Sequence, residues 1–137
     1  MNITSDQRAE LIRRAQEARG RAYAPYSGYR VGAAVLAGSG HIYDGANVEN
    51  AAYPSGICAE RAAVFNAIGR GEREVQAVVV ATENGGTPCG SCRQVLFEFG
   101  PQAAVIMVDG SGKVVAQATL PDLLPMAFGA DHLSRKT

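Results

Sequence analysis

Residues 58–81 read CAERAAVFNAIGRGEREVQAVVVA, and this stretch decides the fold that the sequence predicts. Residues 58–68 have a helical composition and are followed by Gly69 and Gly71, which favour the end of a helix. Residues 75–81 form a nearly continuous apolar run, as expected of a strand that is covered on both faces. A helix followed by a strand of this kind indicates an α/β fold.

The flanking segments continue the same succession of helices and strands. Between them, residues 45–56 form a long, weakly patterned segment rich in Asn and Gly, and long loops in compact domains are often functional. The sequence predicts an α/β sandwich with a mixed sheet, in a single domain of residues 1–137 that ends in a polar tail, residues 134–137. The expected helices are residues 5–19, 89–99 and 121–126, and the expected strands are residues 31–36, 41–43, 103–108 and 113–118.

The charge balance argues against several classes of partner. Lys plus Arg and Asp plus Glu both number 13, so the formal net charge is zero, and we expect no general attraction to nucleic acid or to an anionic membrane. No apolar run approaches the roughly 20 residues that a membrane span needs. The first residues, MNITSDQRAE, lack the apolar stretch of a signal peptide. We therefore expect a cytoplasmic protein, whose three cysteines are thiols or metal ligands rather than disulfide partners.

The three cysteines have the spacing of a metal site. Cys89 and Cys92 form a CxxC pair, and Cys58 lies 31 positions upstream. Each falls at or near the start of a predicted helix, where the partial positive charge of the helix end favours the thiolate form. Sulfur ligands suit zinc, and three protein ligands with water in the fourth position are typical of a catalytic zinc site.

Two other interpretations of the cysteines remain. His41 or His132 could supply a fourth ligand and close the site into a structural one, although neither lies in a local ligand pattern. The CxxC pair could also be a redox pair of the thioredoxin type, but such a pair needs no third cysteine. The number of cysteines favours catalytic zinc.

Glu60 is the candidate proton carrier. Zinc lowers the pKa of a bound water toward neutrality, and hydrolysis by such a water also requires that protons move from it to the group that leaves. A carboxylate near the metal but not bound to it can carry them. The alternative is a surface glutamate in the first turn of a helix, where acidic residues are common.

Cys58-Ala59-Glu60 and Pro88-Cys89-Gly90-Ser91-Cys92 resemble the two halves of the zinc-binding signature of the cytidine deaminase family. The resemblance covers essentially the whole chain, in the same order and at similar spacing. The further matching segments are Ala24-Pro25-Tyr26-Ser27, Val31-Gly32-Ala33-Ala34, Asn47-Val48-Glu49-Asn50-Ala51-Ala52-Tyr53, Arg61, Arg93-Gln94 and Leu123-Leu124-Pro125 with Phe128.

This resemblance implies a fold, a reaction and an assembly. The implied fold is a three-layer α/β/α sandwich with a mixed central sheet of about five strands. The implied reaction is the hydrolysis of cytidine and 2′-deoxycytidine to uridine and 2′-deoxyuridine with release of ammonia, in pyrimidine salvage. A zinc-bound hydroxide would attack C4 of the base while Glu60 shuttles protons. The implied enzyme is a homotetramer with one Zn²⁺ per subunit.

The resemblance also implies which residues contact the substrate. Asn47 and Glu49 match a pair that hydrogen-bonds the ribose, and Ala59 lies in the matching base-binding segment. Tyr29 stands where the family usually has a phenylalanine that packs against the pyrimidine, so its hydroxyl is a departure. Phe128 matches an aromatic residue that enters a neighbouring subunit's site. Ordinary core packing is the alternative for either ring.

Arg61 follows the proton carrier directly, as in the short-form enzymes. Zinc with three thiolates carries a net negative charge, which weakens it as a Lewis acid. A guanidinium that donates to a ligating sulfur would offset this charge. We expect Arg61 to tune the metal.

Other functions compete with this one. Blasticidin-type antibiotic deaminases share the cysteine elements but resemble the chain less around Glu49. Polynucleotide and transfer-RNA deaminases usually have a histidine where this chain has Cys58. Outside these enzymes, the chain could be a zinc-stabilised interaction module or an inactive relative, although no structural need explains an acid at Glu60.

Overall fold

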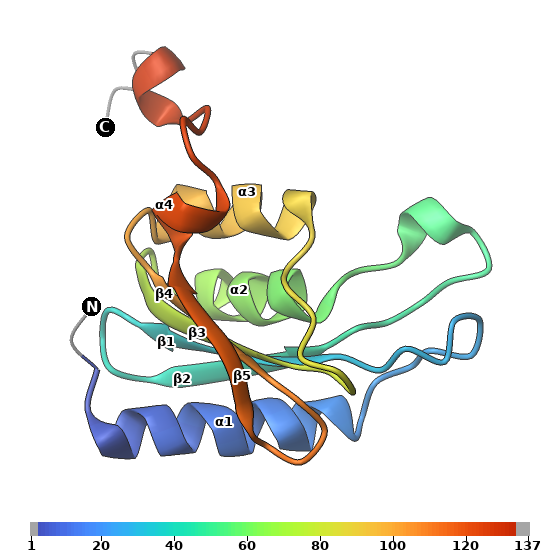
Figure 1. Ribbon diagram of the computed structural model, residues 1–137. Coiled ribbons are helices and arrows are strands. Elements are labelled where there is room, and N and C mark those ends of the chain that lie inside the picture. The colour runs from blue at the N-terminus through green and yellow to red at the C-terminus, as the bar shows by residue number, and fades with distance from the viewer. Residues whose placement is uncertain (1–2, 134–137) are drawn as a thin grey trace.

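A five-stranded mixed sheet forms the centre of the computed structural model, which describes residues 3–133 (Figure 1). The strands follow the order β2-β1-β3-β4-β5; β3 and β4 are parallel and the other neighbours are antiparallel. The predicted mixed sheet of about five strands is therefore confirmed. The strands are β1 (Gly32–Ala37), β2 (Ile42–Ala46), β3 (Val75–Ala81), β4 (Ala104–Val108) and β5 (Val114–Thr119).

Helices cover both faces of this sheet. Helix α1 (Ser5–Arg19) lies on one face, and α2 (Ala59–Gly69) and α3 (Gly90–Phe99) lie on the other (Figure 1). The three-layer α/β/α arrangement is therefore confirmed. A short helix, α4 (Leu120–Leu123), follows β5 directly. Within residues 3–133, no helix combines the length and the apolar character that crossing a membrane requires.

Local sequence signals account for the ends of α1. The backbone N–H of Gln7 donates to the Thr4 side chain at 3.0 Å, and the backbone N–H of Thr4 donates to the Gln7 side chain at 2.9 Å. This reciprocal pair is a capping box, which satisfies amides that have no partner inside the helix. The helix ends at Gly20, as predicted.

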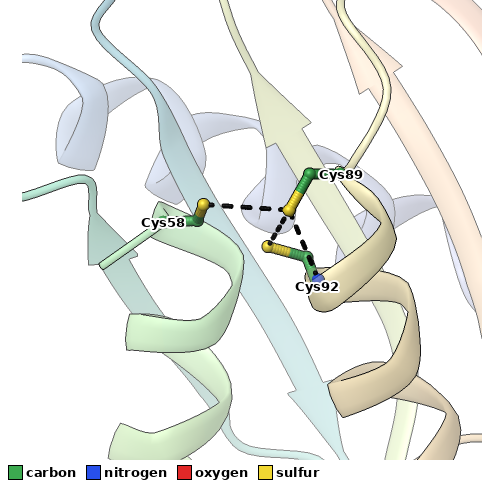
Figure 2. A group of neighbouring side chains, drawn as sticks. All are labelled: Cys58, Cys89 and Cys92. Atoms are coloured by element: carbon green, nitrogen blue, oxygen red, sulfur yellow. Dashed lines mark hydrogen bonds between the residues drawn. The ribbon is translucent and has the colours of Figure 1, made fainter. Parts of the chain in front are cut away.

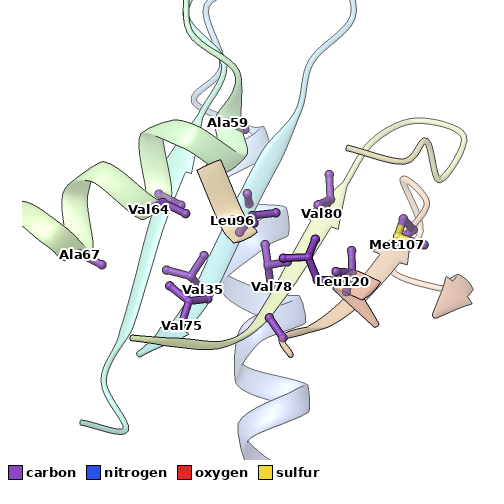
Figure 3. Packing of buried hydrophobic residues seen from close by; sticks show 14 residues of the cluster. Val35, Ala59, Val64, Ala67, Val75, Val78, Val80, Leu96, Met107 and Leu120 are labelled. Atoms are coloured by element: carbon purple, nitrogen blue, oxygen red, sulfur yellow. The ribbon is translucent and has the colours of Figure 1, made fainter. Parts of the chain in front are cut away.

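The sheet divides the core into two clusters, and the central strand β3 contributes side chains to both. Val78 and Val80 belong to the cluster beneath α2 and α3, where Val64 and Leu96 meet the sheet (Figure 3). Alternate residues of the same strand, among them Val79, belong to the cluster beneath α1. Side chains of a strand alternate between its faces, so a strand covered on both sides must be apolar throughout. This explains the apolar run in the sequence.

The structure differs from the prediction mainly near the C-terminus. The helix expected at residues 121–126 ends at Leu123, because Pro125 disfavours a helical conformation at Leu124. A 3₁₀ turn, Ala130–Leu133, follows where no element was expected. The predicted polar tail, residues 134–137, lies outside the described residues.

The second strand and the long loop also differ from the prediction. Strand β2 covers Ile42–Ala46 rather than residues 41–43, because it pairs with β1 along five residues. The segment expected to be a loop therefore contributes its first residues to the sheet. It also contains a 3₁₀ turn, Tyr53–Ser55.

Close packing of β2 against α2 requires a glycine at position 45. A Cβ atom on Gly45 would lie 2.5 Å from the backbone nitrogen of Ala63 and 2.8 Å from the carbonyl carbon of Ala62. Gly45→Ala should therefore lower the free energy of unfolding by about 1–3 kcal/mol, because backbone atoms cannot move aside easily. Urea denaturation measures this. Gly69→Ala is the control, since a Cβ there meets nothing within 4 Å. Equal stability of the two variants would contradict the prediction.

Candidate active site

The two helices on the upper face of the sheet begin beside each other and bring the three cysteines together (Figure 2). Cys58 is the N-cap of α2, Cys89 is the N-cap of α3, and Cys92 lies in the first turn of α3. Their sulfur atoms all lie within 4.8 Å of one another, and all three cysteines are free thiols. The structure thus joins the CxxC pair to the distant third cysteine.

The sulfur positions fit a zinc ion. A tetrahedral site with Zn–S distances near 2.3 Å places its sulfurs about 3.8 Å apart. The Sγ of Cys58 lies 3.9 Å from that of Cys89, which lies 3.3 Å from that of Cys92. Neither histidine joins the three thiols: Nδ1 of His41 lies 3.2 Å from the Ser39 hydroxyl, and Nδ1 of His132 accepts from the Gly129 amide at 3.1 Å. The donor set is therefore three sulfurs, which leaves a fourth position for a water molecule or a substrate.

The surroundings of the thiols favour a thiolate at Cys58. Hydrogen bonding from Cys92, followed by interaction with the Arg61 guanidinium, lowers the pKa of Cys58 to about 5. Nη2 of Arg61 donates to this sulfur at 3.4 Å. The pKa of Cys92 is raised, mainly by its hydrogen bond to Cys58 and by its burial. Negative charge on the cluster therefore concentrates where Arg61 can offset it.

Glu60 is buried beside the thiols. Its side chain belongs to the first turn of α2, and the residue is only 5% exposed. Burial raises its pKa, and the neighbouring Cys58 charge acts in the same direction. A surface glutamate would be solvated, so the surface interpretation is wrong. A buried carboxyl group with a raised pKa can both accept and donate a proton near neutral pH.

A cavity of about 630 Å³ opens next to this cluster. Its volume is in the range of small-molecule sites. The predicted residues Tyr29, Asn47, Glu49, Ala59, Glu60 and Arg61 line it, together with Cys58 and Cys89. Phe128 does not line it: its ring is half exposed and stacks on His132 with centroids 5.1 Å apart. The structure thus gathers every predicted site residue except Phe128 around Cys58 and the cavity.

Asn47 holds the backbone of the cavity wall. Its Oδ1 accepts from the Val31 amide at 2.8 Å, and its Nδ2 donates to the Tyr29 carbonyl at 2.9 Å. An amide side chain offers two donor hydrogens and two acceptor lone pairs. One donor and one acceptor therefore remain for a ligand.

Glu49 organises the loop at the mouth of the cavity. It accepts from the amides of Tyr26 and Ser27 at 2.9 and 3.1 Å, and from the Ser27 hydroxyl. These bonds, with that of the Ser27 hydroxyl first, lower the pKa of Glu49. A carboxylate has about four acceptor positions. The side chain is therefore ionised, held in place, and still able to accept a hydrogen bond from a ligand.

Several lining residues were not predicted as site residues. Thr82 is the first polar residue after the apolar run of β3 and is only 3% exposed. Ligands of α/β proteins bind at the carboxyl ends of strands, so its position was a usable signal. Tyr26 and Tyr53 meet edge to face at 6.1 Å at the cavity mouth. Their contact joins two loops that nothing in the local sequence relates.

Comparison with known proteins identifies the family. The sequence model of the family described as "Cytidine and deoxycytidylate deaminase zinc-binding region" matches residues 5–108. The chain is 42% identical over 127 residues to cytidine deaminase of Sporosarcina psychrophila, covering 91% of this chain and 93% of the relative. It is 41% identical over 129 residues to cytidine deaminase of Halalkalibacterium halodurans, covering 93% and 98%.

Comparison with solved structures leads to the same family. The crystal structure of cytidine deaminase from Burkholderia pseudomallei matches with a TM-score of 0.83 and 43% identity, covering 92% of this chain and 100% of that one. Cytidine deaminase from Mycobacterium tuberculosis matches with a TM-score of 0.78 and 38% identity, covering 88% and 96%. The zinc-compatible thiols, the buried glutamate, the family match and these structures together show that the chain belongs to the cytidine and deoxycytidylate deaminase family.

Proposed function

We propose that this protein, as a single domain of residues 1–137, hydrolyses cytidine and 2′-deoxycytidine to uridine and 2′-deoxyuridine, with release of ammonia. The observation that carries the proposal is a buried glutamate, Glu60, beside three converging thiols in a cavity of nucleoside size. We assign the enzyme to pyrimidine salvage in the cytoplasm, and its three free thiols support a reducing location.

Cys58, Cys89 and Cys92 would hold one Zn²⁺ per subunit. Zinc lowers the pKa of a coordinated water, so that hydroxide is available near neutral pH. The two helix ends and Arg61 lessen the negative charge of the three thiolates. This is the role that we propose for Arg61.

Glu60 moves the protons. As a carboxylate it takes a proton from the attacking water and delivers it to the ring nitrogen N3, while oxygen adds to C4. The second proton of the water passes by the same carboxyl group to the amino group, which leaves as ammonia when the C4–N4 bond breaks. Low exposure of Glu60 keeps bulk water from competing for these protons.

The remaining cavity residues bind and orient the nucleoside. Asn47 and Glu49 would bind the ribose through the donor and acceptor positions that their structural hydrogen bonds leave free. The Tyr29 ring would pack against the pyrimidine, and the Ala59 backbone would lie beside the base. All four residues line the same cavity, which supports these roles.

The active enzyme is proposed to be a homotetramer in which Phe128 completes a neighbouring subunit's site. Two observations support this. The ring of Phe128 is 56% exposed, and the segment that carries it extends away from the sheet beyond α4 (Figure 1). Met126 on the same segment is also fully exposed. Apolar side chains on a projecting segment are suited to contact another subunit.

Glu60→Ala should reduce kcat for cytidine and deoxycytidine by about 10²–10⁴, because the proton shuttle is lost, while zinc content stays the same. The ultraviolet absorbance change on uridine formation measures turnover, and elemental analysis measures zinc. Glu98→Gln on the exposed side of α3 is the control. Cytosine and a blasticidin-type antibiotic should react poorly. A zinc-loaded wild-type protein that turned over neither nucleoside would refute the proposed function.

Arg61→Gln should raise the pKa of Cys58 from about 5 in protein stripped of metal, because a cation that stabilises the thiolate is removed. Wild-type Cys58 should then alkylate readily at pH 6, whereas the variant should need a pH about one unit higher for the same rate. Mass spectrometry of the Cys58 peptide measures this. The variant should also lose zinc faster to a chelator. The exposed Arg70→Gln is the control; unchanged alkylation and zinc retention in Arg61→Gln would remove the proposed tuning role.

Light scattering should give a mass four times the 14.3 kDa of one chain. A mass of one or two chains would contradict the proposed tetramer.

Phe128→Ala should lower kcat/KM about tenfold or more, because an aromatic contact with the neighbouring subunit's site is lost. Mixed tetramers of Phe128→Ala and Glu60→Ala subunits should regain activity, because some sites combine an intact Glu60 with a neighbour's intact Phe128. Arg70→Gln, an exposed change outside this segment and the cavity, is the control. Mixed assemblies that stay inactive would exclude a shared site.

A further inference from the structure

We propose that Tyr29 is a positioning residue whose hydroxyl locks the segment between β3 and α3, residues 82–88, before substrate binds. This segment is the short connection that leads from the end of β3 to Cys89. The proposal rests on contacts of the hydroxyl that a phenylalanine at the same position could not make. It assigns to Tyr29 a function separate from the packing of its ring.

The first observation is a chain of hydrogen bonds that begins at this hydroxyl. Tyr29 donates to Oδ1 of Asn84 at 2.8 Å, and the Thr82 hydroxyl lies 3.4 Å from the same oxygen. The Thr82 oxygen in turn accepts from the Gly86 amide at 2.8 Å. Thr82 is buried, so its two bonds are partly shielded from water, whereas the bond from Tyr29 to Asn84 lies at the surface of the cavity. The hydroxyl of Tyr29 is thus tied to three residues of one loop.

The second observation is that Tyr29 is itself anchored on the opposite wall of the cavity. Its amide donates to the Ser27 hydroxyl at 2.9 Å, and its carbonyl accepts from Asn47 at 2.9 Å. Ser27 also donates to Glu49. The side chain of Tyr29 therefore connects the wall that carries Asn47 and Glu49 with the loop that leads to the thiols.

The third observation is a close approach that involves only the hydroxyl. A Cβ atom on Gly86 would lie 2.7 Å from the Tyr29 oxygen, whereas its next neighbours, on Asn84 and Thr82, would be at 3.8 Å. The backbone of Gly86 lies outside the left-handed region, so its conformation does not require glycine. A side chain at position 86 would have to displace the tyrosine hydroxyl. Positions 29 and 86 are consequently coupled.

A loop that is already ordered before substrate binds lowers the free-energy cost of binding. If the hydroxyl is removed, part of the binding energy must be spent on ordering residues 82–88, while the chemistry of the bound complex stays the same. KM should therefore rise without a matching loss of kcat. This kinetic consequence rests on the proposed function, whereas the effect on the loop does not.

Tyr29→Phe keeps the ring and removes the hydroxyl. In the zinc-loaded protein without substrate, amide hydrogen exchange of the peptide that covers residues 82–88 should become about three- to tenfold faster, as expected for the loss of one hydrogen bond. KM for cytidine should rise about threefold to tenfold, and kcat should change less than about twofold. Asn84→Ala, which also removes the contact with the Thr82 hydroxyl, should accelerate exchange at least as much, and adding Tyr29→Phe to it should have no further effect. Tyr23→Phe, which removes an exposed hydroxyl outside the cavity, is the control.

A second pair of variants tests the coupling directly. Gly86→Ala should accelerate exchange of the segment in the wild-type background, because the new methyl group collides with the hydroxyl. In the Tyr29→Phe background the same substitution should have little further effect. Unchanged exchange in Tyr29→Phe, or an equal effect of Gly86→Ala in both backgrounds, would overturn the proposal. Failure of the proposed reaction would instead appear as a zinc-loaded wild type without turnover, whatever the exchange rates.

Discussion

The packing of α2 and α3 side by side on one face of the sheet is the constraint on which the site depends. Val64 of α2 and Leu96 of α3 are buried in the same apolar cluster as Val78 and Val80. This packing fixes the positions of the first turns of both helices. Burial of such side chains contributes about 1.5–3 kcal/mol each, far more than any single polar contact at the surface. The N-terminal ends of the two helices then lie beside each other, and this position alone brings the thiols at the two ends together.

The electrostatic arrangement follows from this geometry. Two helix N-termini point their partial positive charges toward the thiols, and Arg61 adds a full positive charge next to Cys58. Glu60, one residue earlier, is buried on the same turn and has a raised pKa. The same helix thus places a group that stabilises negative charge and a group that can hold a proton within one turn of the Cys58 thiol. Such opposed environments for neighbouring titratable groups are characteristic of catalytic sites.

The other half of the cavity is built from loops, and its residues serve two purposes. Asn47 and Glu49 use part of their hydrogen-bonding capacity to hold the backbone at Val31 and Ser27, and keep the remainder available for a ligand. Rigid support of this kind reduces the conformational entropy that binding must overcome. Tyr29 extends the support across the cavity to the connection before Cys89. The wall that carries Asn47 and Glu49 and the connection that leads to Cys89 are therefore one hydrogen-bonded unit.

Local patterns in the sequence were sufficient for most of the fold. The apolar run of β3 and the helical composition after Cys58 act through neighbours in the chain, and each predicted its element to within a residue or two. The end of α4 was missed because the effect of Pro125 on Leu124 outweighed helical composition. The ligand pair Cys89 and Cys92 was equally local, since residues three apart share one face of a helix.

The sequence by itself determined the ligand types, their number and the acid beside them. Only the tertiary structure decided that Cys58 meets Cys89 from 31 residues away, that Glu60 is buried, and that Tyr29 reaches Asn84 across 55 residues. Contacts of this range arise when separate elements pack on a common sheet, and no local pattern encodes the distance between two helices. Phe128 illustrates the same limit, because only the tertiary structure shows that its half-exposed ring stacks on His132 outside the cavity.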